Sequence, residues 1–195
     1  DANSGSMTSI YIFGGNFNNS GHIFARTLSE GEAIGFHAAG TSTRVGENGW
    51  ETRSVLRFSS TGTIAAVALG GTATAVNIES GANRFENFGN ILAQGAISTG
   101  IIYDTLYLTS SEQNIYNAGT ISAISTSNIP SVGIIAINQQ DKNFSIINSG
   151  SITADYAIMA DGLNIVVQNQ SGGTLTGSII LGSFNDTLIN DGEIT

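Results

Sequence analysis

The 195-residue sequence contains no cysteine. It can therefore form no disulfide bond and no thiolate metal site, although this absence suits a secreted bacterial protein and a cytosolic protein equally. Basic residues are few as well, since six Lys and Arg stand against fifteen Asp and Glu, and the formal net charge is −9. This balance argues against nucleic acid or an anionic membrane as a partner, because both need a basic patch.

Charged residues of both signs make up only 11% of the chain, against about 25% in an ordinary globular protein. Gly, Ser, Thr and Asn must supply the polar surface, and because they suit turns or strands better than helix interiors, the composition disfavours a helical protein. No apolar run reaches the ~18 residues that a membrane-spanning helix needs. No signal peptide opens the chain, and both ends fall inside a repeat, so we expect a mature product or a piece of a longer protein.

The sequence does contain a short repeat of the form Asn-x-Gly-x-Ile-x-Ala. An apolar residue stands two positions after the glycine of each copy, and in every copy but the first another large apolar residue stands two positions before the Asn or its replacement. Alternation at period two on both sides of a turn predicts strand, turn, strand. The glycines of the eight copies are Gly5, Gly21, Gly62, Gly89, Gly119, Gly150, Gly173 and Gly192.

The interval between successive glycines varies from 16 to 41 residues. A solenoid explains this variation, because its strands stack in register while the connecting loops differ in length. We expect the corner Asn to hydrogen-bond to its equivalents along the axis, and the Gly beside it to permit close approach of neighbouring backbones. One further strand fits most intervals, at 33–38, 74–79, 100–103, 132–137, 157–160 and 177–181.

These patterns predict that residues 1–195 form one all-β segment. The predicted fold is a right-handed parallel β-helix of about seven coils with three short strands each. A single coil cannot bury enough apolar surface to offset its loss of backbone entropy, so each coil depends on its neighbours.

The repeat Ile-x-Asn-x-Gly-x-Ile-x-Ala resembles those of bacterial autotransporter (type V secretion) passenger domains. The likeness is strongest at 177–195, where a Leu-Gly-x-x-Asn-Asp-Thr block precedes Asn-Asp-Gly-Glu-Ile-Thr. The resemblance implies a right-handed β-helix, an extracellular or bacterial cell-surface location and a role as stalk or adhesin. The partner would be a host-surface or cell-surface protein or glycan, or another copy of the chain. The family motif carries no catalytic residues, so none is transferred.

No nucleophile motif, phosphate loop or paired-histidine metal motif occurs, so we expect no catalysis, no cofactor and no metal. The isolated His22 and His37 are both expected to face outward. The alternative is a carbohydrate-active or carbohydrate-binding β-helix of the polysaccharide lyase or hydrolase type, which needs carboxylates on one face. Asp186 is otherwise expected to cap a turn. The candidate carboxylates are Asp104, Asp141, Asp155, Asp161 and Asp186.

The segment 26–57 departs most from the repeat, since it holds four of the six Lys and Arg and the only tryptophan. Two long loops, near 26–32 and 40–52, are expected to project from the solenoid as binding elements. Trp with Arg is a common pair at binding hot spots. The competing hypothesis is that the second loop covers the flank or end of the solenoid with its Trp packed against the coils. The candidate ligand-binding residues are Arg44, Glu47, Trp50 and Arg53.

An extracellular structural or adhesive module without catalysis is therefore the leading hypothesis for function. A third possibility, an ice-binding or self-assembling solenoid, is disfavoured by the residues that follow the repeat glycines. An ice-binding surface requires flat, regular rows of Thr, whereas these positions hold Ser, His, Thr, Asn and Glu.

Overall fold

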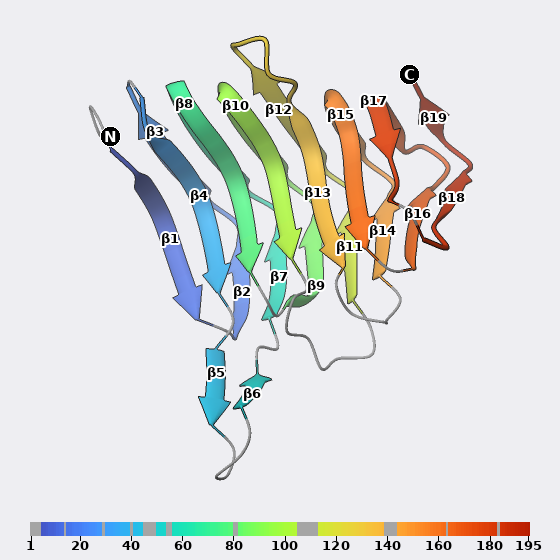
Figure 1. The fold of residues 1–195 in the computed structure, drawn as a ribbon, viewed down its shortest axis with the longest axis horizontal. Coiled ribbons are helices and arrows are strands. Elements are labelled where there is room, and N and C mark those ends of the chain that lie inside the picture. Colours follow the sequence, from blue (N-terminus) through green and yellow to red (C-terminus); the bar gives the residue numbers. More distant parts are fainter. Residues whose placement is uncertain are drawn as a thin grey trace.

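The computed structural model of the chain describes residues 5–13, 15–28, 30–39, 41–44, 50–53, 56–79, 82–104, 113–138, 144–162, 164–182 and 184–195. This part of the chain is all-β, and most of its strands belong to two long parallel sheets (Figure 1). Parallel strands that stack in chain order fit a β-solenoid. Across the described ranges, no helix is long and apolar enough to cross a bilayer.

The larger sheet has ten strands, and its long strands bend partway along. In β10, the register with β8 shifts between Gly95 and Ile97, which divides the sheet into a first arm before the bend and a second arm after it. The strands of the main path are β1 (Met7–Phe13), β4 (Glu32–Ala39), β8 (Thr63–Glu79), β10 (Asn90–Asp104), β12 (Thr120–Ser125), β15 (Ser151–Gly162), β17 (Thr174–Ile180) and β19 (Glu193–Ile194), while β3 (His22–Thr27) and β13 (Val132–Asn138) pair with parts of the long strands.

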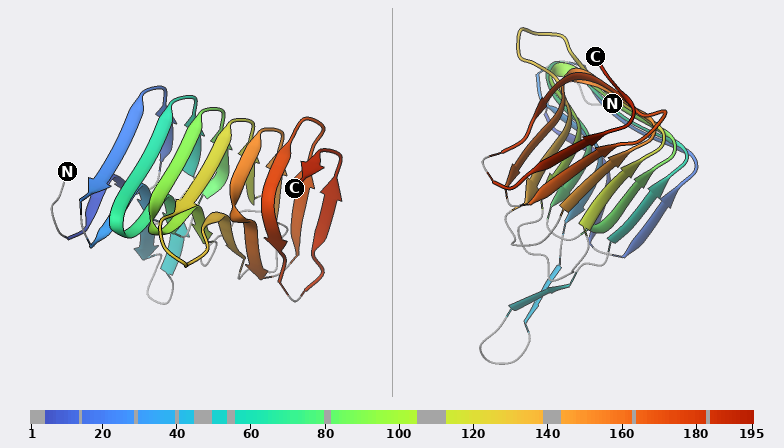
Figure 2. Two further views of the ribbon diagram at one scale, coloured as in Figure 1. Left: turned by 90° about the horizontal axis from the view of Figure 1, so that it is seen from above. Right: turned by 90° about the vertical axis from the view of Figure 1, so that its right-hand side faces the viewer.

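The smaller sheet has seven parallel strands and faces the larger one (Figure 2). We call each of its strands, together with the arm segments that follow it in the chain, a rung. In chain order its strands are β2 (Asn16–Asn19), β7 (Leu56–Ser60), β9 (Ala82–Asn87), β11 (Gln113–Asn117), β14 (Phe144–Asn148), β16 (Ile165–Asn169) and β18 (Thr187–Asn190).

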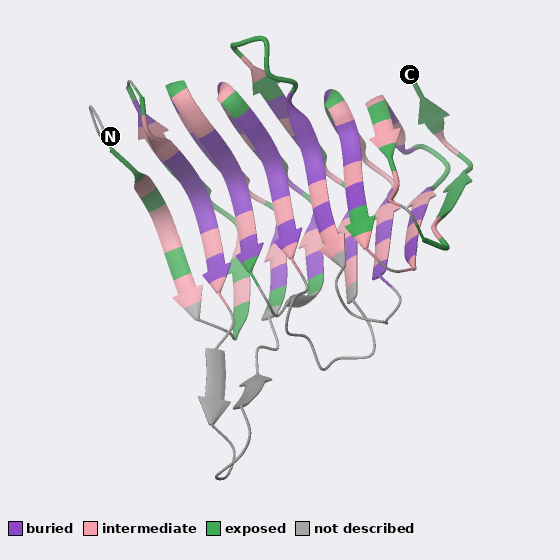
Figure 3. Ribbon diagram, in the orientation of Figure 1, coloured by how far each residue is buried: buried purple, intermediate pink, exposed green. Residues whose placement is uncertain are grey.

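Inward-facing side chains form rows that run from rung to rung. The period-two prediction is confirmed, because buried and more exposed residues alternate along β14 and β16 (Figure 3). Each buried Ile or Phe of such a row contributes about 1.5–3 kcal/mol of transfer free energy. One row contains the buried Phe58, Phe85, Ile115, Ile146 and Val167, and the row facing it contains the buried Ile64, Ile91, Ile121, Ile152 and Leu175.

A row of asparagines lines the corner between the smaller sheet and the first arm. The side-chain amides of Asn87, Asn117, Asn148 and Asn169 each donate a hydrogen bond of 2.8 Å to the Oδ1 of the next asparagine in the row, which ends at Asn190. Because the first four are buried, these bonds satisfy amides that would otherwise destabilise the core. The expected bonding of corner asparagines along the axis is confirmed.

Seven of the eight predicted copies align in this way, since their apolar residues pair in register from Ile23 to Ile194. The assignment of the first copy is wrong, because Met7 pairs with Ala33 in the second arm. A Cβ on Gly31 would lie 2.2 Å from the carbonyl oxygen of Gly5, so Gly5 belongs to the corner between the two arms. Glycine precedes an apolar strand at both corners. The segment from Gly5 to Met7 therefore fits the repeat pattern although it lies at the other corner.

The additional strands expected between the copies are also confirmed. Five of the six ranges fall within strands of the second arm. The last, 177–181, extends one residue past the end of β17 at Ile180.

Candidate functional site

The predicted binding segment contains a separate hairpin. β5 (Thr41–Arg44) and β6 (Trp50–Arg53) pair as an antiparallel two-stranded sheet, and Figures 1 and 2 show it standing away from both parallel sheets. Its register places Arg44 opposite Trp50 and Arg53 opposite Thr41. The candidate Glu47 lies outside the described residues. The hairpin thus brings two of the four candidate binding residues to one register position.

The other expected long loop, near 26–32, is wrong. β3 continues to Thr27 and β4 begins at Glu32, so only four residues separate the two strands. The sequence between these strands lacks the repeat. The strands nevertheless continue to Thr27 and from Glu32, so the lack of the repeat did not indicate a long loop.

Two of the candidate carboxylates share one row at the end of the second arm. Asp104 pairs in register with Ile137, which in turn pairs with Asp161. Glu79 is the neighbour of Asp104 on the other side of this row. Asp141 lies outside the described residues. In the described part of the chain, no group of three or more His, Cys, Asp or Glu side chains could hold a metal ion.

The remaining carboxylates have individual structural partners. Asp186 accepts a hydrogen bond of 2.9 Å from the backbone N–H of Ile165, in the preceding rung. It therefore ties two rungs together instead of only capping its own turn. Asp155 lies at the corner between the arms, where it contacts Ser131.

Both histidines lie on outward positions, as expected. His22 is exposed. The side chain of His37 is only 13% exposed, because Tyr11 and Glu79 cover it: its ring packs edge-on against Tyr11 at 4.5 Å between centroids, and its Nε2 lies 3.4 Å from a carboxylate oxygen of Glu79.

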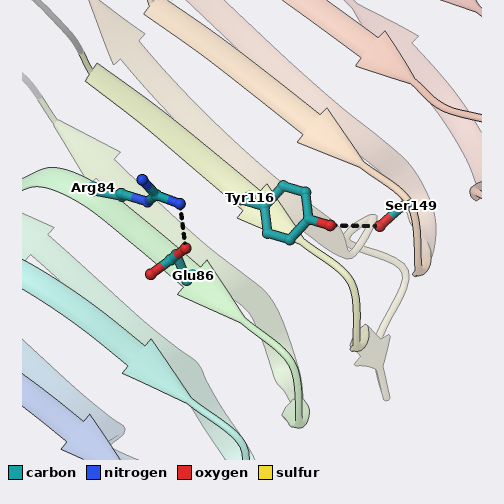
Figure 4. Close-up of polar contacts among 4 residues, drawn as sticks. All are labelled: Arg84, Glu86, Tyr116 and Ser149. Atoms are coloured by element: carbon teal, nitrogen blue, oxygen red, sulfur yellow. Dashed lines mark hydrogen bonds and ion pairs between the residues drawn. The ribbon is translucent and has the colours of Figure 1, made fainter.

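The outer face of the smaller sheet carries polar side chains that contact one another (Figure 4). A guanidinium nitrogen of Arg84 lies 2.6 Å from a carboxylate oxygen of Glu86 in the same strand, and the hydroxyls of Tyr116 and Ser149 lie 3.2 Å apart across two rungs. These contacts pair side chains that a surface ligand would otherwise use.

One rung departs most from the repeat pattern at the corner between the arms. β8, β10 and β15 pass this bend as continuous strands, whereas β12 ends at Ser125 and β13 begins at Val132. Six residues separate these two strands, more than the four between β3 and β4. The intervening residues 126–131 form a loop that rises above β12 in Figure 1. The hydroxyl of Ser125 donates to the carbonyl of Ala96 at 3.0 Å, and the backbone N–H of Ile129 donates to the hydroxyl of Ser127 at 3.1 Å. The loop is therefore held by its own serines.

Asp155 fixes the far end of this loop. Its Oδ2 accepts hydrogen bonds of 2.8 Å from both the backbone N–H and the hydroxyl of Ser131, and its own N–H donates to that hydroxyl at 3.0 Å. The hydrogen bonds from Ser131 lower the pKa of the Asp155 carboxyl below its ordinary value, because they stabilise the ionised form.

A pocket of ≈ 310 Å³ lies beside the loop. Sequence reasoning named Asp155 among the carboxylates but missed the pocket. Two signals mark the loop, namely the only proline of the chain, Pro130, and the Ser-Thr-Ser-Asn stretch before it. The pocket is lined by Ser127, Asn128, Ile129, Pro130, Asp155, Tyr156 and Ser178.

Comparisons with protein-family models, with curated proteins and with solved structures find no match to this chain. The likeness of its repeats to autotransporter passenger domains therefore stays a prediction from the sequence.

Proposed function

We propose that this chain is an extracellular structural and adhesive module of the autotransporter passenger type, without catalytic activity. In this proposal it is a right-handed parallel β-helix of about seven coils of three short strands, serving as a rigid stalk or adhesin on a bacterial surface. At ~4.8 Å per coil, such a segment is roughly 34 Å long.

The observation that supports the proposal most is the continuous register of the rungs. The same inward positions pair from β2 to β18 in the smaller sheet, and asparagine side chains add a second line of hydrogen bonds along the axis. Because every inner rung is bonded to both neighbours, bending requires many contacts to break together. Such an element suits a spacer that holds a binding surface away from a cell.

The hairpin of β5 and β6 is the proposed adhesive element, with Arg44, Glu47, Trp50 and Arg53 as its contact residues. Its separation from the two parallel sheets supports this role, because an element that projects from a rigid scaffold is free to meet a partner. The proposed partner is a host-surface or cell-surface protein or glycan, or a second copy of the chain.

The test measures adhesion of beads coated with the purified chain to cultured cells and to immobilised matrix proteins. We expect Trp50→Ala to keep the melting temperature of the parent and to weaken adhesion by about tenfold, the size of a moderate hot spot. Thr52→Ala, on the same strand, is the matched control and keeps adhesion. A chain whose beads adhere to no surface, or a Trp50→Ala variant that unfolds, would contradict the adhesive role of the hairpin.

A carbohydrate-active β-helix is the second candidate, and the row that places Asp104 beside Glu79 and on one line with Asp161 favours it. Paired carboxylates on one face are what glycoside cleavage needs. Release of reducing ends from a panel of polysaccharides, lost in Asp104→Asn, would support this candidate. Absence of any release with the folded parent chain would reject it.

A further inference from the structure

We propose that the pocket beside the loop 126–131 binds a neutral sugar unit, with Asp155, Asn128 and Tyr156 as its main contacts. This site is distinct from the hairpin of β5 and β6 and does not depend on the stalk role.

Asp155 offers a fixed acceptor in this pocket. Its Oδ2 already accepts two hydrogen bonds from Ser131, whereas its Oδ1 accepts none from the described residues. The carboxylate is exposed, and Ser131, which orients it, is buried. A positioned, ionised carboxylate oxygen is a strong acceptor for a ligand hydroxyl, and its orientation costs little entropy when the ligand binds.

Three more polar residues line the same pocket. Asn128 and Ser178 line the pocket, and within the described chain their side chains make no hydrogen bond. The hydroxyl of Tyr156 is equally without a described partner, and Tyr156 pairs in register with Ser178. A carboxylate, an amide and two hydroxyls together can both donate and accept, as the hydroxyls of a sugar require.

The pocket also has an apolar wall. Tyr156, Pro130 and Ile129 line it beside the polar residues. The C–H faces of a pyranose ring pack on such a surface while its hydroxyls reach polar partners at the edges, the mixed lining that small-ligand sites use. The volume of ≈ 310 Å³ lies at the lower end of the ~300–1,000 Å³ of such sites. Because the pocket is open to solvent, it suits one sugar unit bound at the surface.

Charge restricts the ligand further. Among the residues that the structure describes, no Lys, Arg or His lines the pocket. The chain carries a net charge of −9, so acidic sugars and phosphates are disfavoured. A neighbouring hollow of ≈ 540 Å³ shares Ser127 and Ile129 with the pocket. A longer neutral glycan has room to continue along it and is expected to bind more tightly than a single unit.

The test uses saturation-transfer NMR of the purified chain with glucose, galactose, mannose, fucose and N-acetylglucosamine, followed by titration of the sugars that bind. We expect at least one to bind with a millimolar Kd. Asp155→Asn and Tyr156→Ala should each raise that Kd by about tenfold, the effect of losing one charge-assisted hydrogen bond or one packing surface. Asn128→Ala, which leaves every described hydrogen bond of the loop in place, should also weaken binding.

Asp191→Asn is the matched control, because Asp191 is an exposed aspartate that lies outside the pocket. It should leave the Kd unchanged. The proposal is overturned if no neutral sugar binds to the folded chain, if the Asn128 and Tyr156 variants bind as the parent does, or if acidic sugars or simple amines bind in preference. Any of these results leaves the stalk proposal standing, since that proposal is tested at the hairpin.

Discussion

The Nδ2 of Asn117 donates a hydrogen bond of 2.8 Å to the Oδ1 of Asn148, the equivalent residue one rung along. The same amide also lies 3.3 Å from the carbonyl oxygen of Gly119 and 3.2 Å from that of Ser151. One buried side chain therefore closes its own corner and links it to the next.

Replacing Asn117 by Ala should lower the free energy of unfolding by about 1–3 kcal/mol, because the amides of Asn87 and Asn148 each lose a buried partner. Urea denaturation followed by circular dichroism measures this change. Asn114→Ala is the control, since Asn114 lies in the same strand but is only partly buried. Equal losses in the two variants would show that the corner bonds add no stability.

Gly119→Ala should destabilise the chain by about 1–3 kcal/mol or more, the cost of overpacking. A Cβ at this position would lie 2.1 Å from the carbonyl oxygen of Gly89. That carbonyl also accepts a hydrogen bond of 2.9 Å from the N–H of Thr120, so moving it away would cost this bond. Gly21→Ala provides the contrast, because nothing lies within 4 Å of its added Cβ. Thermal unfolding of both variants checks the prediction, which fails if their melting temperatures fall equally.

Phe58→Ala should cost about 3–5 kcal/mol, as expected for a buried aromatic side chain. Phe58 is fully buried, and its ring stacks on Phe85 at 4.4 Å and packs edge-on against Phe36 at 4.8 Å. Phe24→Ala should change the free energy of unfolding by less than about 0.5 kcal/mol, because that ring is 51% exposed. Denaturant titration of the pair is decisive: a similar cost at both positions would contradict the assigned core.

Acid should release the loop 126–131. The pKa of the Asp155 carboxyl lies below its ordinary value of 3.8 because Ser131 donates two hydrogen bonds to it. Because the pKa is lower in the folded state than in the unfolded state, the contact is fully stabilising at a pH above the unfolded-state pKa. This stabilisation is lost as the pH falls through the folded-state pKa. The amide proton of Ser131 should therefore titrate in NMR spectra with a midpoint below 3.8.

Asp155→Asn is the control for that titration, because it removes the ionisable group and keeps an acceptor oxygen. The Ser131 amide should then show no pH-dependent shift in the acid range. A parent midpoint above the ordinary value would mean that Ser131 does not stabilise the ionised carboxyl.

Much of the fold could be predicted because its determinants are local and repeated. Phe85, Asn87 and Ile91 each mark one inward position, and their equivalents recur often enough to define rows without any coordinates. Gly5 is the exception, because it lies at the corner between the two arms and not at the Asn-x-Gly corner. Which corner a glycine occupies depends on the strand beside it, and Met7 pairs with Ala33, 26 positions later.

The candidate sites were less predictable for the same reason. Arg44 and Trp50 were grouped by composition, and their register became visible only in the hairpin. Asp155 was one of five candidate carboxylates, and nothing local separates it from Asp161. What separates them is Ser131, which reaches Asp155 from 24 residues away.

By itself the sequence determined the all-β class, the inward rows and the chemistry of the Asn-x-Gly corner, because side-chain alternation and backbone freedom are properties of a few neighbouring residues. Only the tertiary structure decided which copies stack, how Asp104 and Asp161 come to share a row, and that Asn128, Asp155, Tyr156 and Ser178 surround one pocket. Those relationships depend on the register between rungs, which is set by hydrogen bonds and packing between residues far apart in the chain.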